Sequence, residues 1–202
     1  MEHAVSYPWR LIACGALAAA LGSAIPATAQ TVSGQARAVQ TNVVGPLGQI
    51  TTTVLADTGT LSGSTDWREA SAEVGSIASI IVGNTLHATA IGWPDQVKSE
   101  ASVADLSITL AGLAVGADFV MARASAMQGL TGAATVNIDG LLINGVPVTV
   151  TGKPNQTITI PGGRVVINER PTSSTSTIVN ALHIAVTGVA DVIVASATAR
   201  AQ

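Results

Sequence analysis

The chain has 202 residues and a formal net charge of −3, and only 10% of its residues are charged, against a typical ~25%. It shows no basic patch, so nucleic acid is not an expected partner, and its 48% hydrophobic content excludes a disordered tail. Aromatic residues make up 2% of the chain. Any core must therefore be built from Val, Ile, Leu and Ala.

The N-terminal segment is typical of a secretory signal peptide. A short polar stretch ends at Arg10 and is followed by an apolar run of about fifteen residues, shorter than the ~20 that cross a bilayer. The small residues of a cleavage site come next: Ala27, Ala29 and then Gln30. The sequence therefore predicts a signal peptide over 1–29, cleaved after Ala29.

Removal of this signal leaves one domain over 30–202, with no further transmembrane segment and no cysteine, because Cys14 leaves with the signal. Export without disulfides is typical of bacterial envelope proteins. The expected location is the periplasm, the cell surface or the extracellular medium. Two alternatives remain open: a retained N-terminal anchor, and a lipid on Cys14, which formally matches a lipoprotein box.

Apolar and polar residues alternate through most of the remaining chain, which predicts β-strands rich in Val, Ile and Thr. Between these runs stand Gly, Pro, Asn and Asp, which are typical of turns. Segment 116–130 is the only plausible helix, and we expect its first part to be a strand as well. The clearest alternating runs are 49–57, 71–83, 157–170, 175–188 and 190–200.

This pattern predicts an all-β fold, an antiparallel β-sandwich or β-roll. Three segments that begin at Ala72, Ala101 and Ala134 each open with Ala-x-Val and end at a Gly, about 30 residues apart. A β-solenoid of imperfect repeats of ~30 residues is therefore the alternative.

The segment 136–170 holds most of the polar groups whose positions look specific. Asn144 and Gly145 predict a tight turn between two strands, and Pro147 predicts an edge strand or a bulge. Asn168 and Glu169 end the last strand of the segment and are expected to satisfy backbone groups there. These positions predict turns and sheet edges.

The two histidines of the mature chain, His87 and His183, lie in strand patterns without the spacing of a metal site. His183 is expected to be a hydrogen-bonded structural histidine on the strand face of Val179, Ala181 and Ala185, and it could meet Asp191 across a turn. No residue pattern indicates a catalytic site, a metal or a cofactor.

Aromatic side chains near polar turns can form platforms for sugars. Trp67 and Trp93 have such surroundings, and Asp95 follows Trp93 closely. With nearby carboxylates, including Glu169, these residues are the expected contacts of a glycan or other ligand, if the chain binds one.

The mature chain resembles the choice-of-anchor P family of bacterial exported proteins. The resemblance covers most of residues 31–198, and its most specific part is the ordered series PNQTITIPG, VVINE, VNALHI and DVIVASA. It implies a surface or secreted module and supplies no catalytic residues. The chain ends in ATARAQ and lacks the LPxTG-like motif that covalent anchoring to the cell surface would use.

Two functions of different classes follow. The first is a non-enzymatic exported β-domain that acts in surface interaction or self-assembly through neutral sheet edges such as 50–56 and 192–199. The alternative is an envelope protein that binds or hydrolyses a glycan or another ligand through Trp67, Trp93 and nearby carboxylates.

Overall fold

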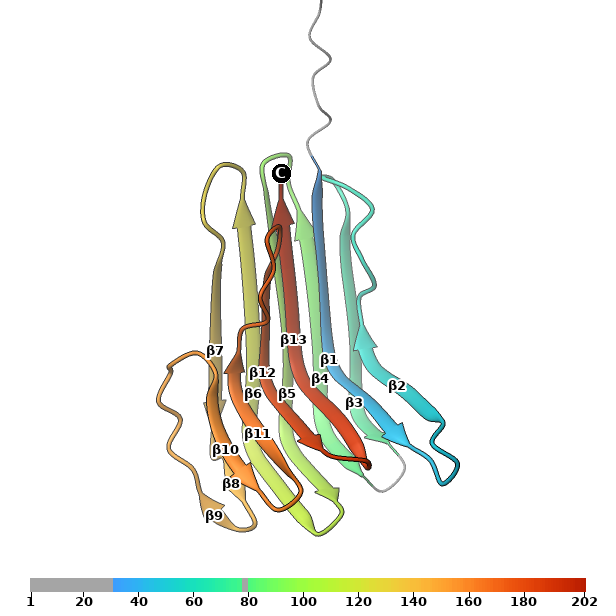
Figure 1. Cartoon of the computed structure of the whole chain (residues 1–202). Helices are drawn as coiled ribbons and strands as arrows, with labels where there is room; N and C mark the ends of the chain where they lie inside the picture. Colours follow the sequence, from blue (N-terminus) through green and yellow to red (C-terminus); the bar gives the residue numbers. More distant parts are fainter. Residues whose placement is uncertain (1–30, 78–79) are drawn as a thin grey trace, which may run out of the picture.

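The computed structural model describes residues 31–77 and 80–202, so the expected signal peptide lies outside the described residues. The described chain forms two antiparallel sheets that pack face to face without closing into a barrel, and it contains no helix (Figure 1). The predicted all-β sandwich is confirmed.

Sheet A has six strands, and its first and last strands in space are β10 and β2. The C-terminal strand pairs with the N-terminal one, which brings the two ends of the described chain together. In spatial order the strands are β10 (Gln156–Ile160), β11 (Gly163–Glu169), β12 (Thr177–Val186), β13 (Ala190–Ala201), β1 (Val32–Val44) and β2 (Ile50–Asp57).

Sheet B has seven strands, six of them in one path, while β7 (Ala133–Asp139) pairs with β6 alongside β8. The path runs β3 (Trp67–Ile77), β4 (Ile81–Gly92), β5 (Gln96–Leu110), β6 (Leu113–Met127), β8 (Leu142–Ile143) and β9 (Val146–Pro147). Sequential strands pair as antiparallel neighbours, so the chain is not a solenoid.

Two local expectations need correction. The alternating run 71–83 is two strands, because a turn separates β3 from β4 and Ile77 pairs with Ile81. The neutral segment 192–199 is not a sheet edge, since it lies in β13 between β12 and β1.

The core between the sheets consists of aliphatic side chains, as the composition requires. Among the described residues no aromatic side chain is fully buried, and the largest buried ones are Ile, Leu and Val, for example Ile108, Ile184 and Leu182. Many core positions are alanines, which lets the two sheets approach closely along their length.

The strands bend where the alternation of faces slips by one residue, near the middle of β1, β12 and β13 and one residue before the end of β2 and β11. In sheet A, Asn168, Ala195 and Ala56 have φ values of 54°, 53° and 48°. Each lies where the pairing register skips one residue on both strands. Consecutive residues such as Ala38 and Val39 are therefore both buried there.

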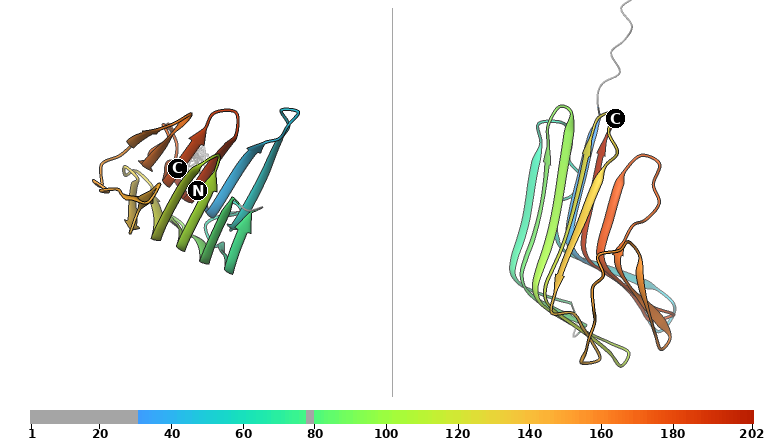
Figure 2. Two further views of the ribbon diagram at one scale, coloured as in Figure 1. Left: turned by 90° about the horizontal axis from the view of Figure 1, so that it is seen from below. Right: turned by 90° about the vertical axis from the view of Figure 1, so that its left-hand side faces the viewer.

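The bends of the neighbouring strands line up across the sheet and give the sandwich a common curvature (Figure 2). In the right-hand view, the lower halves of the β11–β13 strands turn toward the outer side of sheet A. The outer face of sheet A is therefore concave at this row of bends.

Candidate functional site

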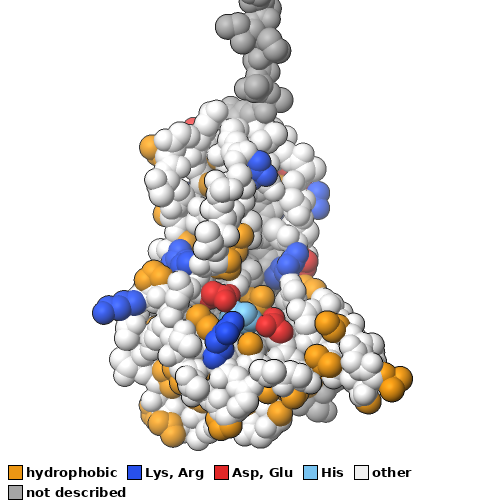
Figure 3. Space-filling model, viewed as in Figure 1, with side chains coloured by type: hydrophobic (Ala, Val, Ile, Leu, Met, Phe, Trp, Pro, Cys, Tyr) orange, Lys and Arg blue, Asp and Glu red, His pale blue; other side chains and the backbone are white. Residues whose placement is uncertain are grey.

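An ion triad lies at the bend on the outer face of sheet A. The ring of His183 in β12 is held between two carboxylates: Nδ1 lies 2.7 Å from Glu169 Oε1, and Nε2 lies 2.7 Å from Asp191 Oδ2. Asn180 donates to the other oxygen of Glu169 at 2.6 Å. Figure 3 shows a histidine between acidic side chains on this face.

The triad favours a charged imidazole. Partial burial opposes the charge, but the hydrogen bonds and charges of Asp191 and Glu169 outweigh it and raise the pKa of His183 above its ordinary value of 6.5. Both ring nitrogens are engaged, which leaves neither for a substrate or a metal. The arrangement links three strands rather than presenting a reactive group.

The bend also changes the face on which His183 stands. The alternation in the sequence places it with Val179, but the slip at Ala181 puts Val179 in the core, with no exposed area, and His183 on the outer face. Only Ala185 of the expected neighbours shares its face.

A second polar group completes the row along the bend. Across sheet A the pairing register runs from Glu169 through Asn180 and Ser196 to Arg37 and Asp57. At the far end, Arg37 Nε donates to Asp57 Oδ2 at 3.0 Å.

The hydrogen bonds to Asp57 decide its charge. Burial would raise its pKa, but bonds from the Gln35 side chain, the Gly59 N–H and Arg37 lower it. The carboxylate thereby ties the end of β2 to β1. Sequence reasoning missed this pair, because neither residue stands out in a strand pattern.

Asn144, Gly145 and Asn168 have the expected local character, but the expectation for Glu169 is wrong: its carboxylate bonds the side chains of His183 and Asn180 instead of backbone groups. Asn144 and Gly145, with φ of 51° and 74°, connect β8 to β9, and the Asn144 side chain accepts from Ala114 N–H at 2.8 Å. Asn168 donates to Gly152 O at 3.0 Å, and its own carbonyl accepts from Asn155 N–H. These contacts hold turns and the loop beside β10.

Arg170 joins the two sheets, and sequence reasoning did not single it out. Its Nε donates to Asn168 Oδ1 at 2.8 Å and its Nη2 to Ala134 O of β7 at 2.7 Å. The guanidinium thus covers a carbonyl on the exposed edge of sheet B.

The structure brings the two tryptophans to one end of the outer face of sheet B. Trp67 is 67% exposed and pairs with Ile91. Ile91 and Trp93 line a groove of about 160 Å³ together with polar side chains, those of Thr89, Lys98, Glu100 and Arg123. The ammonium of Lys98 lies 5.9 Å from the centre of the Trp93 ring. Asp95 is in the adjoining turn and does not line this groove.

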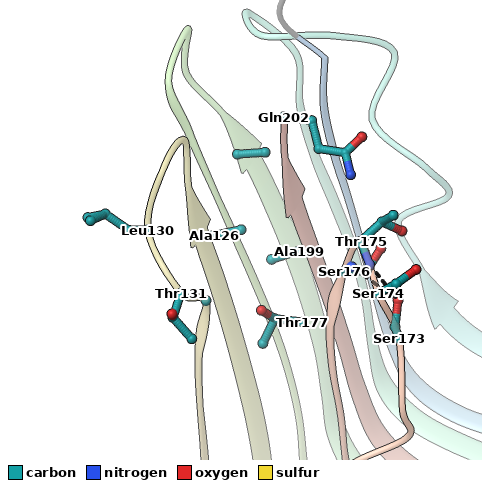
Figure 4. Close-up of a pocket in the computed structure, with 12 residues that line it drawn as sticks. Ala126, Leu130, Thr131, Ser173, Ser174, Thr175, Ser176, Thr177, Ala199 and Gln202 are labelled. Carbon is teal, nitrogen blue, oxygen red and sulfur yellow. Dashed lines mark hydrogen bonds between the residues drawn. The ribbon is translucent and has the colours of Figure 1, made fainter.

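A hydroxyl-rich cleft of about 350 Å³ lies between the turn after β6 and the loop before β12 (Figure 4). Leu130 and Thr131 line one side, and Ser173 to Thr177 line the other. No titratable side chain lines it. Within 31–77 and 80–202, no three His, Cys, Asp or Glu residues are grouped so as to hold a metal ion.

Four of the five edge strands have features that discourage pairing with another chain. The edge strand β9 has two residues and contains Pro147, and in β7 the carbonyl of Ala134 is bonded to Arg170. The five-residue β10 lies beside the preceding loop, to which Gln156 is bonded at Thr149 and Thr151. Charges protect β3: Arg68, Glu69 and Glu73.

The fifth edge strand, β2, is different. From Ile50 to Ala56 it has no charged residue and no proline, and it pairs only with β1. Ile50 is 67% exposed and Val54 is 37% exposed.

An apolar groove of about 550 Å³ adjoins β2 on the outer face of sheet A. It runs between the β1–β2 hairpin and the β12–β13 turn, and Val44, Ile50, Val186 and Ala190 line it. Asp191 of the ion triad lies at its border. Leu47, at the tip of the β1–β2 hairpin, is 93% exposed.

Compared with protein-family models, curated proteins and solved structures, the chain shows no significant match. The resemblance to the choice-of-anchor P family therefore stays a prediction. In the described part of the chain, no helix has the length and apolar character needed to cross a membrane.

Proposed function

We propose that this protein is a non-enzymatic module of the bacterial envelope or exterior that acts by self-association through an exposed sheet edge. One observation carries the proposal. The edge strand β2 is uncharged from Ile50 to Ala56 and exposes apolar side chains, whereas β9 and β10 are short, β3 is charged, and β7 exposes no large apolar side chain. An unprotected edge is a template for another strand.

The location is part of the proposal and rests on the sequence. The signal-like segment over 1–29 and the resemblance to choice-of-anchor P proteins both favour export. A module outside the cell can be concentrated at a surface, where pairing between edges becomes effective.

The energetics require more than backbone pairing. A short edge contact forms a few hydrogen bonds of about 0.5–1.5 kcal/mol each, which falls short of the ~8 kcal/mol of a micromolar contact. Full burial of a fully exposed Ile or Val side chain adds about 1.5–3 kcal/mol, and Ile50 and Val54, which are 67% and 37% exposed, can gain a part of it. Ile50 and Val54, with the adjoining groove, supply such area.

Sedimentation velocity over a hundredfold concentration range tests the proposal. We expect a species larger than the monomer whose fraction grows with concentration. A monomer at every concentration would overturn self-association as the function.

A second candidate function is glycan binding on the outer face of sheet B. It is favoured by the position of Trp67 and Trp93 at one end of this face, beside a groove with Lys98, Glu100 and Arg123. Aromatic faces stack on sugars, while charged and hydroxyl groups bond to their hydroxyls.

A glycan array with the parent chain and the Trp67→Ala and Trp93→Ala variants tests this candidate. Val146→Ala is the matched control, because Val146 is an apolar side chain with a similar exposed fraction of 64% and lies in β9, at the other end of the strand order of sheet B. Binding that both tryptophan variants lose and the control keeps would support it. Absence of binding, or equal binding by all four proteins, would reject it.

A further inference from the structure

We infer that the partner of β2 is the same strand of a second copy, paired antiparallel about Thr52, and that assembly stops at this dimer. The inference rests on the proposed self-association and specifies its partner, register and size.

The register follows from the faces of β2. Ile50, Thr52 and Val54 lie on the outer face, opposite Val44, Asn42 and Gln40 of β1. A two-fold axis at Thr52 places Ile50 of each copy opposite Val54 of the other. It also places the two Thr52 residues opposite each other. β-branched and Thr–Thr pairs of this kind are favourable across antiparallel strands.

Neighbouring registers are less complementary. An axis at Thr53 places Ile50 opposite Ala56, which is at a bend with φ of 48°, and Thr52 opposite Val54. An axis at Thr51 places Ile50 opposite Thr52. Only the axis at Thr52 pairs the exposed apolar residues with each other and keeps the charge of Asp57 outside the contact.

The dimer is closed because the same edge is used on both copies. In a two-fold contact the β2 edge of each copy is occupied by the other copy. A filament would therefore need a second, different edge that accepts a strand. On the opposite side of the sandwich, Arg170 covers β7 at Ala134 O, and the loop at Thr149 and Thr151 lies beside β10. Growth beyond two copies is therefore discouraged.

Disulfide cross-linking tests the register. We would introduce Thr52→Cys into the full chain with Cys14→Ser, so that the new thiol is the only one, and follow oxidation on non-reducing gels. Thr157→Cys is the matched control, an exposed threonine on the edge strand β10. We expect Thr52→Cys to form covalent dimers at least tenfold faster than the control.

A mixture extends this test. Ile50→Cys and Val54→Cys chains should cross-link to each other faster than either does to itself, because these positions face each other in the inferred register. Equal rates for Thr52→Cys and Thr157→Cys would overturn the pairing through β2.

Sedimentation velocity separates this inference from the proposed function. We expect the parent to saturate at the dimer, Val54→Lys to be a monomer with the parent's circular dichroism spectrum, and Thr157→Lys to remain dimeric. Growth of the parent beyond a dimer, or a dimeric Val54→Lys, would overturn the inference while leaving self-association intact. A monomeric parent would overturn both.

Discussion

The ring of His183 in β12 lies 2.7 Å from Asp191 of β13 and is equally close to Glu169 of β11. One side chain thus connects three adjacent strands at the row where the sheet bends. Loss of the ring's charge would therefore weaken contacts that hold β11, β12 and β13 together at this row.

The free energy of unfolding should depend on pH through this ring. The folded state raises the pKa of His183 above 6.5. The charged ring therefore stabilises the fold fully below the unfolded pKa, and this contribution is lost as pH rises through the folded pKa. We expect stability to decline above pH ~6.5, measured by urea unfolding between pH 5.5 and 9.

His183→Gln should remove this decline and cost about 1.5–3 kcal/mol at pH 6, the usual range for hydrogen bonds to charged groups. His87→Gln is the control, since His87 contacts only Glu69, at 3.2 Å on the exposed face of sheet B. If His183→Gln kept the parent's pH profile, the triad would not be its source.

Gly163→Ala should be strongly destabilising. A Cβ at Gly163 would lie 2.0 Å from the carbonyl oxygen of Ala185, a backbone atom of the paired strand. The β11–β12 pairing must therefore shift, which we expect to cost several kcal/mol or prevent folding. Gly63→Ala, at a glycine with open space around it, should leave the melting temperature within a few degrees of the parent. Similar melting temperatures for the two variants would show that the β11–β12 pairing does not require a glycine at position 163.

Arg170→Met should lower stability by about 1.5–3 kcal/mol. The change removes the bonds to Ala134 O and Asn168 Oδ1 but keeps most of the apolar length of the side chain. Arg164→Met is the matched control, because Arg164 lies in β11, just before Arg170 in the chain, and is exposed. It should change stability by less than ~0.5 kcal/mol. Equal effects in denaturant titrations would rule out a special role for Arg170.

The bends store backbone strain at alanine positions, which predicts an unusual response to glycine. Ala56 has φ of 48°, a conformation that costs an L-residue about 1–2 kcal/mol. Ala56→Gly should be neutral or stabilising, whereas Ala56→Val should destabilise by more than ~1 kcal/mol. If the Ala56→Val variant were more stable than the Ala56→Gly variant, the backbone at this bend would not be strained.

Much of the fold could be predicted from local sequence. Alternation with period two, as in 190–200, predicts a strand, although the runs 71–83 and 157–170 are each two strands separated by a turn. Asn144-Gly145 specifies a turn because few other residue pairs adopt positive φ twice. The predicted aliphatic core follows from composition alone. These features depend on backbone sterics and on side chains within a few residues.

The polar sites could be predicted only in part. The expected meeting of His183 with Asp191 across the turn is confirmed, but the other contacts were not expected. The residue pattern does not reveal that the alternation of inner and outer faces shifts by one residue at Ala181. The expected face of His183 is therefore wrong. The pairs Arg37–Asp57 and Arg170–Ala134 join residues 20 and 36 positions apart. Nothing in the local pattern around these residues indicates such partners.

Local residue preferences are enough to specify neutral, aliphatic strands joined by tight turns. Which neutral strand becomes a sheet edge depends instead on how the strands are ordered in the folded chain. Segments 50–56 and 192–199 look alike in the sequence, yet β13 is enclosed by β12 and β1 while β2 is open. Strand order is set by the burial gained between distant segments, and that order determines which backbone groups remain available to a partner.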